Sequence, residues 1–250
     1  TIWKYAAGKS VLGSPVIFNG KVYVGASDGC FRAIDLKSGK GVWTYSDVQG
    51  FVECRAFVDK EQVVFGSWGN RLYSLDPQTG ALQWEWKCEK PSRMYSPAAV
   101  WPVKAEGKIF IAVPDRRLYA LDAATGKELR HYDKSAREAV GVSPDGKTVY
   151  CKSMWHTITS VDAATLGVNW QTQTGAGYEI SPTPIERIGD EVIMPTDKGN
   201  IIGFSAVDGS RLWARKVSIA LVNPMEVWSE KGSGYILAST MDGTVTLLRK

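Results

Sequence analysis

Charged and aromatic residues recur at similar points along this 250-residue sequence, just ahead of short apolar segments or at the turns that follow them. An arginine beside a carboxylate is a strong, oriented hydrogen-bonding group, and an aromatic ring offers a flat surface for stacking. Together they predict a pocket for a polar small molecule, a glycan or a peptide. The candidate binding residues are Glu53, Arg55, Trp68, Arg93, Tyr95, Arg137, Glu138, Trp155, His156, Tyr178, Glu179 and Asn223.

The same residues have a second interpretation that needs no ligand. The charged groups would form solvated ion pairs in a wide channel, and Trp68 and Trp155 would cover apolar edges of the sheets. Both interpretations predict pairing between arginine and glutamate. They differ in whether a cavity remains for a ligand.

The sequence contains no familiar catalytic arrangement. The patterns Gly-x-Ser-x-Gly, His-Glu-x-x-His and Gly-x-Gly-x-x-Gly, a P-loop and an EF-hand loop are all absent from it. A zinc or acid–base site needs converging His, Cys or carboxylate groups, but there are only two histidines, and we expect His131 to lie at the surface. We therefore expect no catalytic residue, no metal site and no cofactor.

Composition narrows the class of protein further. The net charge of +4 comes from dispersed Lys and Arg without an RNA-binding signature, which disfavours nucleic acid as a partner. No apolar run approaches the length of about 18 residues that a membrane-spanning helix needs. Four cysteines, at 30, 54, 88 and 151, are scattered through the chain, and we expect buried free thiols. A Cys30–Cys54 disulfide is the alternative.

A repeat organises the chain. The segment 28–43, DGCFRAIDLKSGKGVW, returns in varied form five more times, and the early copies place a tryptophan eight residues after the aspartate. Corresponding positions 35, 76, 122, 162, 205 and 249 are 41, 46, 40, 43 and 44 residues apart. A period of about 40 residues is typical of propellers, solenoids and arrays.

Each unit predicts four short antiparallel strands joined by tight turns, which is the pattern of a propeller blade rather than a solenoid coil. The fold class is therefore all-β, a six-bladed β-propeller of four-stranded antiparallel blades in a single domain, 1–250. We expect each repeated Asp to cap a turn, the following Gly to take a positive φ, and the Trp to pack between blades. The expected blades are 6–45, 46–86, 87–132, 133–172, 173–215, and 216–250 completed by 1–5.

The two ends of the sequence predict how the ring closes. Residues 2–5, IWKY, have the outer-strand pattern, and the last unit ends on its third strand. We expect the N-terminal strand to complete the last blade, because closure removes exposed sheet edges. The alternative is that the chain forms part of a ring of seven or eight blades.

The repeated pattern, Asp-Gly, an alternating strand ending in Asp, a Thr-Gly or Ser-Gly turn and then Trp, resembles the PQQ-like repeat of quinoprotein alcohol dehydrogenases and of the BamB family. Those dehydrogenases usually have eight blades, a vicinal cysteine pair, a stacking tryptophan and Ca²⁺, whereas no two cysteines here are adjacent. Loops 50–53, 93–99, 137–141 and 177–180 also resemble, more weakly, a propeller module that follows a metallophosphoesterase domain in some members.

The resemblance implies a non-catalytic binding or interaction module that is part of a larger periplasmic or secreted protein. Its partner would be another protein or a covalently linked catalytic domain. A small-molecule or glycan sensor is the alternative, and a PQQ-dependent dehydrogenase is less favoured.

Overall fold

A computed structural model describes residues 1–88, 101–113, 115–133, 136 and 140–250. Its strands form six antiparallel sheets in chain order. Sheets 1 to 3 contain β1 (Val16–Phe18), β2 (Lys21–Gly25), β3 (Phe31–Asp35), β4 (Gly41–Tyr45); β5 (Phe57–Val58), β6 (Val63–Ser67), β7 (Arg71–Leu75), β8 (Leu82–Lys87); and β9 (Val103–Ala105), β10 (Lys108–Val113), β11 (Arg117–Asp122), β12 (Glu128–Tyr132). Sheets 4 to 6 contain β13 (Val140–Val142), β14 (Thr148–Lys152), β15 (Trp155–Asp162), β16 (Val168–Tyr178); β17 (Glu186–Ile188), β18 (Glu191–Pro195), β19 (Asn200–Ser205), β20 (Arg211–Lys216); and β21 (Glu226–Glu230), β22 (Ser233–Ser239), β23 (Val245–Arg249).

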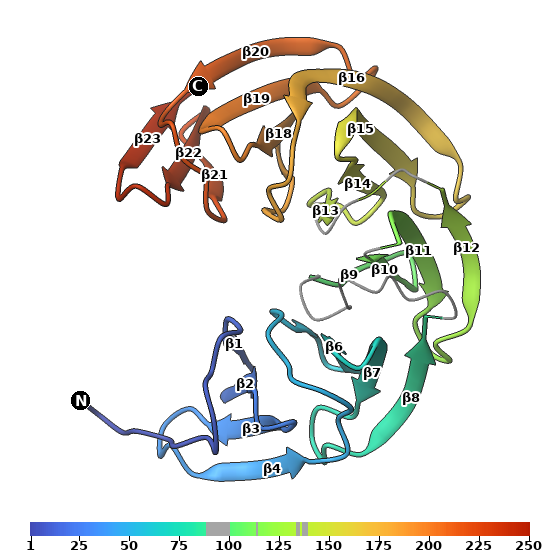
Figure 1. Cartoon of the computed structure of the whole chain (residues 1–250), viewed down its shortest axis with the longest axis vertical. Coiled ribbons are helices and arrows are strands. Elements are labelled where there is room, and N and C mark those ends of the chain that lie inside the picture. Colours follow the sequence, from blue (N-terminus) through green and yellow to red (C-terminus); the bar gives the residue numbers. More distant parts are fainter. Residues whose placement is uncertain (89–100, 114, 134–135, 137–139) are drawn as a thin grey trace.

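The six sheets follow one another around an arc, with the first strand of each sheet toward the axis and, in sheets 1 to 5, the fourth strand at the outer edge (Figure 1). Every strand pairs with its neighbour in sequence, so each sheet is a simple meander. This arrangement confirms the predicted all-β propeller. Within the described residues there is no helix, and hence none long and apolar enough to cross a membrane.

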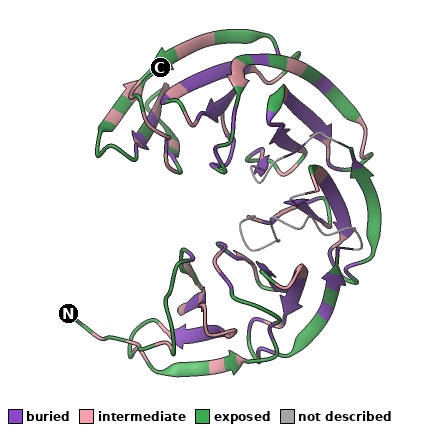
Figure 2. Cartoon of the chain, viewed as in Figure 1, coloured by how far each residue is buried: buried purple, intermediate pink, exposed green. Residues whose placement is uncertain are grey.

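The core lies in the second and third strands of each sheet, as Figure 2 shows by the concentration of buried residues there. β6 is buried along its whole length, whereas β4 and β12 are mostly exposed. Successive sheets pack face to face through these middle strands. Phe31 of sheet 1 stacks on Phe65 of sheet 2 with ring centroids 4.1 Å apart. Burial of such large apolar side chains is the main favourable contribution to folding.

The turn between the third and fourth strands of a sheet is where the preceding sheet makes contact. At Asp122, one carboxylate oxygen accepts hydrogen bonds from the Thr125 backbone N–H at 2.8 Å and from its hydroxyl at 2.7 Å. Gly126 then adopts a φ of 71°. Trp84 of the preceding sheet lies on this glycine and donates its indole N–H to the Ala123 carbonyl at 2.9 Å. The predicted roles of Asp, Gly and Trp are confirmed here.

The same contact recurs around the arc. Trp43 donates to the carbonyl of Pro77 at 3.2 Å, and Trp170 donates to that of Ala206 at 3.0 Å. Where the repeat has Arg130 in place of Trp, the guanidinium takes over the role and donates to Leu166 at 2.7 Å. Sheets 1 to 4 are each joined to the next sheet in this way, by a side chain from an outer strand and a backbone carbonyl in a turn, whereas Trp213 of sheet 5 donates to Glu191 of its own sheet.

The structure differs from the expected closure. Residues 1–5 belong to no strand, and the sheet β21–β23 has three strands instead of four. Trp3 instead packs on Gly39 and donates its indole N–H to the Leu36 carbonyl at 2.9 Å, as Trp43, Trp84 and Trp170 do with the sheet that follows each of them. This contact holds the N-terminal segment on sheet 1, while sheet 6 lies at the other end of the arc (Figure 1).

All four cysteines are free thiols. Cys54 does not pair with Cys30; its sulfur accepts a hydrogen bond from the Gly66 N–H at 3.3 Å and is fully enclosed. Burial raises the pKa of the Cys54 thiol to about 12, so it remains protonated and unreactive at neutral pH.

Candidate functional site

Two adjoining cavities lie on the axis of the arc, between the first strands of the sheets. One has a volume of about 320 Å³ and apolar walls that include Val16, Phe57 and Val142. The other, of about 450 Å³, is bounded by Ser14 and Pro15 of sheet 1 and by residues 224–227 of sheet 6. Three side chains line both cavities: Arg55, Trp101 and Glu186. We refer to the two cavities together as the axial site.

Two acidic residues of the axial site, Glu186 and Glu226, occupy equivalent points in different repeats, and Arg55 lies close to that point in a third. Glu186 and Glu226 are the first residues of the inner strands β17 and β21, where β1 and β13 begin with Val16 and Val140. Arg55 comes two residues before β5. Because all the inner strands start on the axis, a charged residue at this point projects its charge toward the shared space.

Arg55 and Trp101 form a cation–π pair, with the guanidinium carbon 5.8 Å from the centre of the indole ring. Such pairs are attractive because the ring face carries negative charge. The carboxyl of Glu186 has a pKa raised to about 7, first because it is buried and second because Glu226 is a nearby like charge; Arg55 partly offsets both effects. Glu186 thus titrates near neutral pH.

The described side chains of the axial site include more unpaired negative groups than positive ones. Within the described residues, the side chains of Arg55, Glu186 and Glu226 have no hydrogen-bond or close ion-pair partner. Lys104 also lines the site, but its ammonium lies 2.7 Å from both Asp59 and Glu61. Among the described side chains, two carboxylates without such a partner therefore face one guanidinium, and these three groups together carry one net negative charge when both carboxylates are ionised.

Two exposed aromatic groups, which we call the rim groups, lie at the edge of the sheets where the inner strands begin. The first rim group consists of Phe51, Glu53 and Trp68. Phe51 and Glu53 lie between β4 and β5, and Trp68 lies in the β6–β7 hairpin. The Trp68 backbone N–H donates to the Phe51 carbonyl at 3.0 Å, and its indole N–H donates to the Glu53 carboxylate at 2.9 Å. The two rings lie 6.2 Å apart. These contacts hold an exposed indole in a fixed orientation.

The second aromatic group on the rim is the pair Trp155 and Tyr178. The two residues are opposite each other where β15 meets the end of β16, and their rings make an edge-on contact at 5.2 Å. Trp155 is 53% exposed and Tyr178 is 45% exposed. His156 follows with a φ of 77° and an exposed side chain. A positive φ at a residue other than glycine is uncommon and accompanies the irregular pairing at this point.

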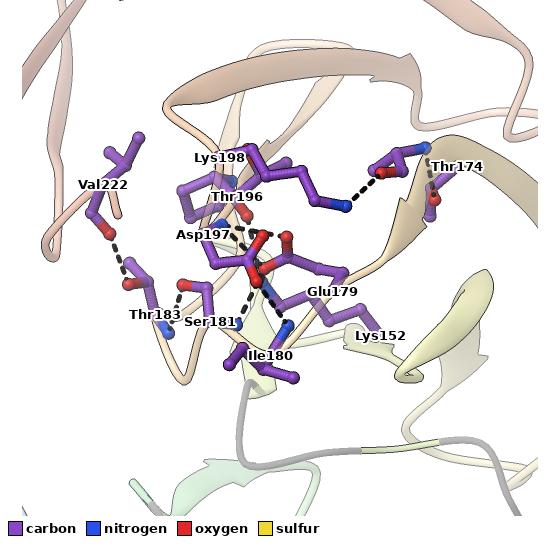
Figure 3. Close-up of polar contacts among 12 residues, drawn as sticks. Lys152, Thr174, Glu179, Ile180, Ser181, Thr183, Thr196, Asp197, Lys198 and Val222 are labelled. Atoms are coloured by element: carbon purple, nitrogen blue, oxygen red, sulfur yellow. Dashed lines mark hydrogen bonds and ion pairs between the residues drawn. The ribbon is translucent and has the colours of Figure 1, made fainter. Parts of the chain in front are cut away.

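Glu179, one of the predicted binding residues, lies in a buried cluster and not in the axial site (Figure 3). Its carboxylate accepts hydrogen bonds from the Lys152 ammonium at 3.1 Å, from the Ser181 N–H at 2.8 Å and from the Asp197 N–H. Lys152 also donates to the carbonyl of Pro195 at 3.0 Å. Through the contacts with Pro195 and Asp197, the pair connects sheet 4 to sheet 5. Burial raises the pKa of Glu179, although Lys152 opposes that shift. These contacts give Glu179 a structural role.

The structure brings one predicted residue, Arg55, into the axial site, and the predicted Glu53, Trp68, Trp155, His156 and Tyr178 lie in or beside the rim groups. Asn223 hydrogen-bonds Ser239 within sheet 6 at 3.1 Å. Arg93, Tyr95, Arg137 and Glu138 lie outside the described residues.

Sequence reasoning missed Trp101, Glu186 and Glu226. Comparing the first residue of each inner strand across the repeats would have shown glutamate at two points where the other repeats have valine or phenylalanine. The described part of the chain contains no group of three or more His, Cys, Asp or Glu residues placed to hold a metal ion.

A family model described as outer membrane protein assembly factor BamB matches residues 1–96 and 94–226 of the chain. The BamB of Nitrosomonas eutropha is 24% identical over 236 residues, which cover 87% of this chain and 54% of the relative. The chain thus spans about half the length of that curated relative.

Two solved structures show the same fold. BamB from Moraxella catarrhalis superposes with a TM-score of 0.74 at 16% identity, covering 99% of this chain and 78% of that one. The quinohemoprotein alcohol dehydrogenase of Comamonas testosteroni gives 0.69 at 18% identity, with 90% and 45% covered.

Proposed function

This chain belongs to the family of the outer membrane protein assembly factor BamB, and from that premise we propose that it is a non-catalytic propeller module that binds a protein partner. The module would act outside the cytoplasm, as part of a longer protein. The name of the family describes an assembly factor, and that name is the ground for proposing a protein as the partner.

The observation that carries this proposal is the pair of rim groups. Trp68 and Trp155 are exposed, yet each is held by contacts with an adjacent aromatic residue, and Trp68 is also held by Glu53. Aromatic residues dominate binding energy at protein interfaces, because they bury a large area and lose little conformational freedom on binding. Indole groups fixed before binding reduce that loss further.

The absence of catalysis is part of the proposal. Three groups that could take part in catalysis are otherwise engaged: the Cys54 thiol is buried, the Glu179 carboxylate accepts several hydrogen bonds, and the His131 ring lies 2.8 Å from Glu128 on an outer strand. Adding pyrroloquinoline quinone with Ca²⁺ is expected to give no absorption band of a bound quinone, and such a band would contradict this part of the proposal.

Photo-crosslinking tests the interaction. A benzoylphenylalanine placed at Phe51 or at Trp155 in the intact parent protein should form a crosslink to the same polypeptide in cells. Leu212, which is 50% exposed on the outer strand β20, provides the control position and should give no such crosslink.

The size of the product identifies the partner class. A shifted band containing a second polypeptide supports a separate protein partner, and a crosslink within the parent chain would instead identify a linked domain. If all three positions give the same products, or if the two rim positions give none, the proposal is wrong.

A further inference from the structure

We propose that the axial site receives a lysine or arginine side chain of the partner, with its charged end between Glu186 and Glu226 and its aliphatic stem against the apolar wall. This inference rests on the proposed function and extends it, because it assigns a chemistry to the part of the partner that enters the axis. Neither glutamate is used by the fold contacts described above.

The first argument is charge. Two carboxylates and one guanidinium face the same space, and among the described residues none of the three has a hydrogen-bond or close ion-pair partner. Like charges in a partly buried site are unfavourable, and an added cation relieves that repulsion. Burial is the main reason that the pKa of Glu186 is raised, and the nearby charge of Glu226 adds to it.

The second argument is shape. The cavity beside Glu186 is walled by Val16, Phe57, Val103 and Val142, and it adjoins the more polar cavity that contains Glu226. A lysine or arginine side chain has an aliphatic stem and a charged head, and this sequence of apolar and acidic surface matches it from end to end. A small inorganic cation would leave the apolar wall unused.

The third argument concerns Arg55. Its guanidinium already lies over the face of Trp101, so a cation fits on this surface, and the protein's own arginine occupies one position there. An incoming cation would be repelled by Arg55 and attracted by the two glutamates. Arg55 is thus predicted to weaken binding, whereas it would be the main anchor if the ligand were an anion.

The test uses two short blocked peptides, acetyl-Val-Lys-Val-amide and the same peptide with norleucine in place of lysine, titrated into the protein by NMR or calorimetry at pH 8. The lysine peptide should bind at least tenfold more tightly. Glu186→Gln and Glu226→Gln should each weaken its binding by about tenfold, which corresponds to about 1.4 kcal/mol. Glu230→Gln, on the same strand β21 but outside the axial site, is the control and should have no effect.

The variant Arg55→Met tests whether the axial site prefers a cationic or an anionic ligand. We expect it to strengthen binding of the lysine peptide, and a loss of binding would show that the site takes an anion and would overturn the inference. Equal affinity for the lysine and norleucine peptides would overturn it as well. So would competition by Ca²⁺ at equal concentration, because that result would identify a cation site for metal.

The test of the axial site can fail while the test of the proposed function succeeds. If the rim crosslinks form in cells while Glu186→Gln and Glu226→Gln leave both the crosslinks and the peptide titration unchanged, the module binds its partner through the rim alone. The inference about the axial site is then wrong, and the proposed function stands.

Discussion

Gly126 is the position where the contact between sheets can be tested most directly. It has a φ of 71°, and a Cβ added there would lie 2.6 Å from the ring of Trp84. Gly107 in the same sheet has a φ of 68°, but a Cβ there would meet nothing within 4 Å. Replacing each glycine with alanine therefore separates backbone strain from the clash with the tryptophan.

The magnitudes follow from these two geometries. Alanine in the left-handed region costs about 1 to 2 kcal/mol, and this is all that Gly107→Ala should lose. Gly126→Ala adds the overpacking of the Trp84 ring, which costs about 1 to 3 kcal/mol more. The total for Gly126→Ala is therefore about 2 to 5 kcal/mol.

Urea unfolding followed by far-ultraviolet circular dichroism measures both losses. A second comparison makes the cause explicit: in a Trp84→Ala background the ring is gone, so Gly126→Ala should cost no more than Gly107→Ala does. The coupling between the two residues should be about 1 to 3 kcal/mol. Equal losses for the two glycines, or an unchanged loss in the Trp84→Ala background, would refute the idea that this contact constrains the turn.

Three further predictions concern charged groups. Lys152→Met should lower the free energy of unfolding by about 3 kcal/mol, because it leaves the buried Glu179 carboxylate without this cation, and adding Glu179→Gln should recover part of the loss in urea unfolding. The pKa of Glu186 is raised to about 7, so the folded protein binds more protons than the unfolded chain between about pH 4.3 and pH 7. The stability that this group contributes should therefore fall as pH rises through that window. The urea midpoint of Glu186→Gln should lack this part of the pH dependence. Hydrogen bonds from Thr79 hold the pKa of Asp76 below its usual value, so the stability that Asp76 contributes is complete above about pH 4 and is lost as pH falls through the lowered pKa. Asp76→Ala should therefore lower the free energy of unfolding at pH 7, and its difference from the wild-type protein should shrink in acid.

The turns and the contacts between sheets could be predicted from sequence, because their causes are local. The aspartate, the glycine and the tryptophan of one repeat stand at fixed spacing, and the physical reason for each is contained in a few residues. Trp84 packs on Gly126 as expected, and even the substitution of Arg130 for tryptophan keeps a donor aimed at the next turn. Local patterns of this kind need no knowledge of the whole ring.

Closure could not be predicted in the same way. Whether the segment carrying Trp3 reaches β23 depends on the rotation between sheets summed around the whole arc, and no single repeat determines that sum. Trp3 shows why the pattern misled: docking on the Leu36 carbonyl needs only the turn of sheet 1. The outer-strand sequence therefore correctly predicted the tryptophan's contact but not a fourth strand for sheet 6.

The axial site was partly missed for a related reason. The contacts that hold the fold lie in the middle strands and in the docking turns, where Phe65 and Trp84 are buried. The first residue of the inner strand differs between sheets: Val140 is buried in the hydrophobic core, whereas Glu186, at the equivalent point of sheet 5, is only partly buried and lines the axial site. The fold thus accepts a charged residue at this point in sheets 5 and 6, and recognition can change there while the architecture stays constant. This separation is also why Glu186→Gln should alter binding of a cationic side chain without disrupting the propeller.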